Sequence, residues 1–230
     1  MRLLACALAC LATLPARAVP DHVEAEYRIT AAGIPIANVF ETYRREGDTY
    51  RIDSRTGAEG VLKIFRDDTV VLHSEGRIGP GGLEPLRFEQ RRERDPSRDI
   101  RARFDWGRSL LLSEYRGESS THALPAGTQD RLSLMYQFMH AAPRADRVRM
   151  HMSNGRKVDR YTYRKVDEPV VETPAGSFAT VHYERVTESE DENSAQLWLA
   201  RDRFNLAVRV VFEDTRGLKL EQTLVKLTTR

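Results

Sequence analysis

The stretch that decides the fold is LRFEQRRERDPSRDIRARFDW, residues 86–106, in which apolar and charged side chains alternate in two runs. Successive side chains of a β-strand point to opposite faces of its sheet, so this alternation predicts two strands with one buried face each. The runs are separated by Asp95-Pro96-Ser97-Arg98, whose residue types favour turns. The stretch therefore predicts an antiparallel hairpin.

The charged residues of this hairpin hold odd-numbered positions on both strands, so an odd number of loop residues places them on one face. A five-residue loop at 96–100 sets opposite charges against each other, for example Glu93 against Arg103, whereas a three-residue loop at 95–97 opposes like charges. Opposite-charge pairs across strands contribute roughly 0.2–1 kcal/mol each, so the five-residue loop is predicted.

Similar runs extend outward over most of the chain and are separated by turn residues such as Asn154-Gly155. Strands are expected at 23–30, 36–44, 49–57, 68–78, 109–116, 147–153, 157–168, 178–187, 194–200, 207–214 and 218–228, with a loop at 117–128. This series is typical of an all-β protein with meandering antiparallel strands.

One segment departs from the strand pattern. Residues 130–140 are apolar on most of a helical circumference, with Asp130 suited to cap the start of a helix and Pro143 to stop it. A helix of this kind is expected to be buried. We therefore predict an all-β fold with minor α content, in which residues 19–230 form a single antiparallel, strongly curved sheet or barrel around one central helix.

Polar residues continue the inward face of several predicted strands. Ser54, Thr56, Gln90, Arg92 and Gln222 share a side with apolar residues that include Leu86, Leu218, Leu220 and Leu224. Unpaired buried polar groups cost about 1–3 kcal/mol each, so these positions indicate either a cavity or groove, or the ends of strands.

The N-terminus has the features of a cleaved export signal: Arg2, an apolar run over 3–14, and Ala16-Arg17-Ala18 before the cut. The run is shorter than the roughly 20 residues that span a membrane, so residues 1–18 are interpreted as a signal peptide cleaved after Ala18. This predicts a periplasmic protein, or alternatively an extracellular one, with no transmembrane segment in the mature chain.

Removal of residues 1–18 changes the composition. Both cysteines of the chain, Cys6 and Cys10, are lost, and the 36 basic residues fall to 34, equal to the 34 acidic residues. A balanced charge does not favour nucleic acid as a partner. Only five of the basic residues are lysines, which indicates either recognition of phosphate groups by arginine or the codon bias of a GC-rich genome.

No motif in the mature chain specifies a reaction. The chain lacks a G-x-S-x-G nucleophile elbow, an S-x-x-K pair and closely spaced histidines. His182 and Glu184 share one face of a predicted strand, which indicates either an acid–base pair or a structural surface pair. No catalytic, cofactor-binding or metal-binding residue is predicted.

Four motifs carry a resemblance that spans most of the mature chain: QDRLS at 129–133, NGRK at 154–157, ETPAGSF at 172–178 and LWLARD at 197–202. With the opening strand pair at 27–39, they resemble an exported bacterial family of unknown function, DUF3108. The resemblance implies a periplasmic, β-rich protein without established catalytic residues.

We expect a non-catalytic exported envelope protein that binds or carries an apolar or amphipathic ligand such as a lipid, or that assists envelope assembly. The alternatives are a structural or protein-interaction module of the envelope and an unrecognised hydrolase. No cofactor is expected, and the oligomeric state is not specified by the sequence.

Overall fold

The computed structural model describes residues 19–59, 69–189 and 191–230. The predicted signal peptide, with Cys6 and Cys10, lies outside the described residues. Within the described residues, no helix is both long and apolar enough to cross a membrane.

Sixteen described strands form one curved sheet, as the alternation predicted, and the sheet does not close on itself. Its order is β8-β7-β6-β5-β4-β3-β2-β1-β16-β15-β14-β13-β11-β10-β9, with β12 paired to β13. Neighbours are antiparallel except for the short pair β9 and β10. The bounds are β1 His22–Ala31, β2 Ile34–Glu46, β3 Thr49–Ala58, β4 Val70–Gly79, β5 Gly82–Arg92, β6 Ile100–Asp105, β7 Leu110–Tyr115, β8 Glu118–Ala123, β9 Gln129–Asp130, β10 Arg147–Ser153, β11 Val158–Asp167, β12 Val170–Thr173, β13 Gly176–Arg185, β14 Ser194–Ala200, β15 Leu206–Glu213 and β16 Lys219–Thr229.

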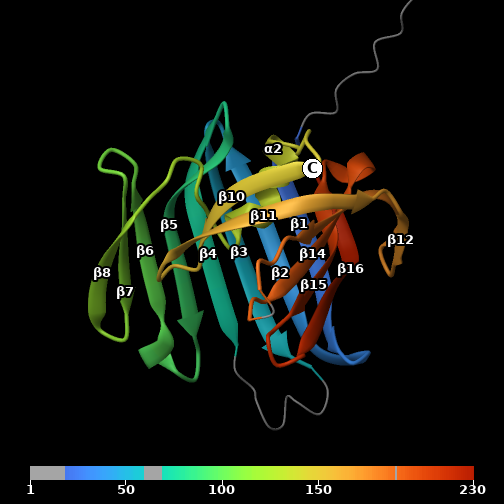
Figure 1. The fold of residues 1–230 in the computed structure, drawn as a ribbon, viewed down its shortest axis with the longest axis horizontal. Coiled ribbons are helices and arrows are strands. Elements are labelled where there is room, and N and C mark those ends of the chain that lie inside the picture. The colour runs from blue at the N-terminus through green and yellow to red at the C-terminus, as the bar shows by residue number, and fades with distance from the viewer. Residues whose placement is uncertain (1–18, 60–68, 190) are drawn as a thin grey trace, which may run out of the picture.

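Helix α2 (Ser133–His140) lies inside the rolled sheet, and strands β10 and β11 cross in front of it (Figure 1). On one side, Tyr136 stacks on Tyr43 of β2, with ring centroids 5.3 Å apart and planes 11° from parallel. On the other side, Leu134 and Phe138 pack with buried residues of β11, β13 and β14. The helix therefore fills the middle of the concave face.

Asp130 performs the capping role that the sequence predicted, although the regular helix begins three residues later. Its Oδ1 accepts hydrogen bonds from the backbone N–H groups of Leu132 and Ser133, both at 2.8 Å. Ser133 also binds Asp130 through its side chain: the hydroxyl oxygen of Ser133 accepts the backbone N–H of Asp130 at 3.0 Å. This reciprocal arrangement satisfies donors that the first turn of a helix leaves unpaired.

The 86–106 hairpin forms with its charges on one face, but both predicted loops are wrong. Arg87 lies opposite Arg103, which leaves a longer connection that contains a 3₁₀ turn, η1 (Pro96–Arg98). The side chain of Asp99 folds back to accept the N–H of Arg92 at 2.8 Å. Ile100 stays in β6 and is buried, a gain that outweighs a few exposed charge pairs.

Three strands, β8, β9 and β12, were not predicted from the sequence. Strand β8 has the sequence ESSTHA, which shows no apolar alternation because nearly all its side chains are exposed. The short strand β12 pairs with β13 beyond the end of β11.

A carboxyl group, that of Glu41 in β2, is buried beneath α2. Its oxygens accept hydrogen bonds from the Tyr136 hydroxyl at 3.0 Å and the Ser54 hydroxyl at 3.3 Å. Burial raises the pKa of Glu41 to about 7, although both hydrogen bonds lower it. The group is therefore protonated in the folded protein under mildly acidic conditions.

This pKa makes the free energy of unfolding depend on pH. Between about pH 4.5 and 7, folded Glu41 holds a proton that the unfolded chain has released, so stability should fall by about 3 kcal/mol as pH rises through this range. Glu41→Gln should remove this fall and exceed the wild type in stability at pH 8. Urea denaturation at pH 5 and pH 8 measures both.

The matched control is Glu118→Gln, because Glu118 is exposed in β8. This variant should keep the pH dependence of the wild type. Parallel pH profiles for the wild type and Glu41→Gln would show that Glu41 does not titrate with a raised pKa.

Candidate functional site

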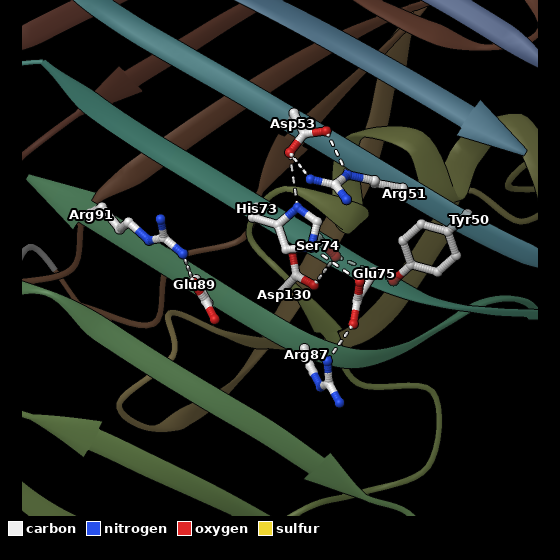
Figure 2. A network of polar contacts seen from close by, with 10 residues as sticks. All are labelled: Tyr50, Arg51, Asp53, His73, Ser74, Glu75, Arg87, Glu89, Arg91 and Asp130. Atoms are coloured by element: carbon white, nitrogen blue, oxygen red, sulfur yellow. Dashed lines mark hydrogen bonds and ion pairs between the residues drawn. The ribbon is translucent and has the colours of Figure 1, made fainter.

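Charged side chains line the outer face of β3, β4 and β5 (Figure 2). His73 lies between two carboxylates, with Nδ1 2.9 Å from Asp53 and Nε2 3.3 Å from Glu75. Arg51 and Arg87 extend the row by binding Asp53 and Glu75 at 2.9 and 3.0 Å. Each basic side chain of this row thus contacts at least one carboxylate.

Burial raises the pKa of Asp53, but hydrogen bonds from Arg51 and His73 outweigh it and hold the pKa below its ordinary value. Among the described residues, no group of three or more His, Cys, Asp or Glu side chains is placed to hold a metal ion. The outer network is best explained as cross-strand ion pairs that stabilise the sheet.

The inner face of the same strands carries a separate contact. Ser74 of β4 donates its hydroxyl proton to Oδ2 of Asp130 at 2.6 Å, and the Tyr50 hydroxyl lies 3.3 Å from Ser74 (Figure 2). All three residues are buried, and burial raises the pKa of Asp130. The network joins the helix cap to the sheet but is closed to solvent, so no substrate reaches it in this conformation.

His182 was paired with Glu184 in the sequence-based hypothesis, and the structure gives each residue a different partner. Nδ1 of His182 is 2.9 Å from Oδ1 of Asp167, whereas Glu184 forms an ion pair with Arg164. A bulge in β11 between Lys165 and Asp167 shifts the pairing, which brings Asp167 opposite His182.

The imidazole of His182 stacks on Trp198, with centroids 4.2 Å apart and planes 7° from parallel. The guanidinium of Arg209 lies 4.8 Å from the centre of the Trp198 ring. Nε2 of His182 is buried and has no hydrogen-bond partner among the described residues. An Asp–His pair activates a nucleophile through this nitrogen, and no nucleophile among the described residues is hydrogen-bonded to it.

The concave face continues beyond α2 to an apolar end, which consists of one cross-strand row: Ile34, Ala31, Leu220, Phe212 and Ala195. Val210, two residues before Phe212 on β15, packs with Leu134 and Phe138 of α2, so this row shares the face that the helix covers. Ile34 is 66% exposed and Phe212 is 38% exposed. The helix therefore leaves this end open.

The structure places the predicted inward polar residues in different surroundings. Ser54 is satisfied by Glu41, and Gln90 donates to the carbonyl oxygen of Arg98 at 3.5 Å. Thr56 and Gln222 are half-buried. Gln222 lies two residues from Leu220 on β16 and on the same face as the row, whereas Thr56 pairs with Val39, five residues from Ile34 along β2.

Two leucines expected on the inward face are not core residues. Leu86 sits at a bulge, where Pro85 takes the buried place, and Leu218 precedes β16 and is exposed. A single extra residue in a strand reverses the face of those that follow, which sequence alternation alone does not reveal.

The His182 stack leads to a stability prediction. His182→Ala should lower the free energy of unfolding by about 2–3 kcal/mol, because it removes the ring stack and leaves a cavity. His182→Phe should lose less, since a phenyl ring keeps the stack on Trp198. Urea denaturation followed by far-ultraviolet circular dichroism checks both, with His151→Ala of half-buried His151 as the control. Equal losses for His182→Ala and His151→Ala would contradict a stabilising stack.

Solved structures similar to this chain include a β-barrel-like protein of domain of unknown function DUF1849 from Brucella abortus, with a TM-score of 0.57 and 14% identity over 93% of this chain and 99% of that chain. Weaker matches are a putative exported protein with a YmcC-like fold from Bacteroides fragilis (TM-score 0.36, 12% identity, covering 91% and 96%) and a putative lipoprotein from Parabacteroides distasonis (0.37, 10%, 91% and 96%). No curated protein matches the chain.

The first of these structures supports the barrel-like fold only, because its sequence identity is low. The family model described as "Protein of unknown function (DUF3108)" matches residues 26–223, which is most of the sequence. The resemblance noted in the sequence is confirmed, and the chain belongs to the DUF3108 family.

Proposed function

We propose that this protein is a non-catalytic binding protein of the bacterial envelope that holds an amphipathic ligand, such as a lipid, at the apolar end of its concave face. The observation that carries the proposal is the open row of Ile34, Ala31, Leu220, Phe212 and Ala195. Export, on which the envelope location depends, is inferred from the leader at 1–18.

The shape of the apolar end favours an extended chain over a flat protein surface. Five neighbouring strands about 4.8 Å apart give the row a length of roughly 19 Å. The row lies on the concave side of the curved sheet, so a narrow alkyl chain would reach it more readily than a broad protein face. Contact with Phe212 and Leu220 would remove apolar surface of both partners from water.

A polar residue beside the row suits a ligand that is only partly apolar. The side chain of Gln222 lies on the same face, two residues from Leu220, and retains partial access to solvent. Its amide offers hydrogen bonds to a head group while the chain lies along the row.

The proposal is tested with dansyl-labelled undecanoic acid, whose fluorescence rises in an apolar site. The wild type should bind the probe saturably, and palmitate should displace it. Phe212→Ser and Leu220→Ser should each weaken binding by about fivefold to thirtyfold, because each removes roughly 1–2 kcal/mol of apolar contact.

Phe40→Ser is the matched control, because Phe40 is also exposed but lies on the outer face of β2, between the inward residues Val39 and Glu41. It should leave probe binding unchanged. Absence of saturable binding, or equal weakening by Phe40→Ser, would refute the apolar end as the ligand site.

A second candidate function rests on the edge strand β8. This strand pairs with β7 on one side, and no described strand pairs with its other side. Its side chains are almost all exposed, and the sequence ESSTHA contains neither Pro nor Lys, the residues that commonly protect an edge. An extended segment of an envelope protein could therefore add to the sheet at this edge.

Photo-crosslinking in intact cells tests this interaction. A benzophenone amino acid in place of Ser119 in β8 should give a discrete crosslinked band, because the partner strand would lie beside it. The same label in place of Arg55, which is exposed in the interior strand β3, should not give that band. Identical patterns from both positions would exclude partner binding at the β8 edge.

A further inference from the structure

A small pocket of about 180 Å³ is lined by four arginines that come from distant parts of the chain. They are Arg92 at the end of β5, Arg98 in η1, Arg131 before α2 and Arg156 after the turn that joins β10 to β11. The amides of Gln90 and Asn154 add polar lining, and no acidic residue lines the pocket.

Local contacts hold the turn that carries Arg156 against the sheet. Gly155 has φ of +86° and lies so close to β6 that a Cβ at this position would be 2.6 Å from Cγ2 of Ile100. The side-chain oxygen of Asn154 accepts the N–H of Arg156 at 2.9 Å, and the Arg156 guanidinium lies 4.1 Å from the centre of the Tyr115 ring. The direction of Arg156 is therefore fixed by the fold.

Three of the four arginines, Arg98, Arg131 and Arg156, form no ion pair within the described part of the chain. The two acidic residues that adjoin them in sequence have other hydrogen-bond partners: Asp99 accepts the backbone N–H of the pocket residue Arg92, and Asp130 binds Ser74 and the start of α2.

The surroundings of Arg131 disfavour its positive charge. Desolvation by its dense surroundings lowers the pKa of Arg131, and the positive charge of Arg92 lowers it further, while Asp130 opposes both effects. Like charges held close together are unfavourable, and a bound anion would reduce their repulsion.

We propose that this arginine pocket binds a phosphate group, either as free phosphate or as the phosphomonoester head of a larger amphiphile. Guanidinium groups offer paired N–H donors that match the oxygens of a tetrahedral oxyanion. The pocket, of about 180 Å³, has room for a phosphate group.

Isothermal titration of the purified exported protein with inorganic phosphate is the first test. One saturable site is expected, and Arg131→Gln and Arg156→Gln should each weaken it by about tenfold or more through the loss of charge-assisted hydrogen bonds. Arg156→Lys should bind phosphate with intermediate affinity, because lysine keeps the positive charge but lacks the paired N–H donors of a guanidinium group. Arg216→Gln, which makes the same charge change in an exposed turn, should have no effect.

Sedimentation with vesicles distinguishes the two sources of the phosphate group. If the ligand is a lipid head, the protein should sediment with phosphatidylcholine vesicles that contain phosphatidic acid, and Arg156→Gln should abolish this. If the ligand is free phosphate, the titration should succeed without sedimentation. Because Arg131 adjoins the helix cap, Arg156→Gln serves as the second variant should Arg131→Gln fail to fold.

The proposal is overturned if neither inorganic phosphate nor phosphatidic acid vesicles bind, or if Arg216→Gln weakens binding as much as Arg156→Gln. This inference is independent of the apolar end. Arg156→Gln should leave binding of the dansyl probe unchanged, so the failure of one site is distinguishable from the failure of the other.

Discussion

The carboxylate of Asp130 is the contact on which the arrangement of this fold depends. One of its oxygens accepts the first backbone N–H groups of the α2 segment, and the other accepts the Ser74 hydroxyl from β4. The helix it anchors touches both halves of the rolled sheet, through Tyr136 on one side and Leu134 on the other. A single buried group thus joins local helix capping to the curvature of the whole sheet.

Features that depend on local chemistry were predictable from the sequence. Val23, Ala25 and Tyr27 alternate with polar residues and form the buried face of β1, and Asp130 caps the helix as its residue type suggests. The connection of the 86–106 hairpin was not predictable from charge. Exposed pairs contribute fractions of a kcal/mol, whereas burial of Ile100 contributes roughly 2 kcal/mol, so burial decides the register.

Features that depend on distant strands were only partly visible in the sequence. The inward polar residues Gln90 and Arg92 indicated either a groove or the end of a strand. Arg92 is the last residue of β5, and both residues line the arginine pocket, which Arg131 and Arg156 reach only through the three-dimensional fold. The partner of His182 was mistaken because one bulge in β11 brings Asp167 into register. A local alternation pattern contains no information about such an inserted residue.

The distribution of polar groups separates stability from recognition. Glu41 and Asp130, whose pKa values are raised by burial, lie beneath α2 where solvent does not reach them, so they cannot exchange protons directly with a substrate. The features that a ligand can contact lie away from this sealed centre: the apolar end, the β8 edge and the arginine pocket. An accessible periphery around a rigid centre is suited to binding, because contacts can be made there without opening the core.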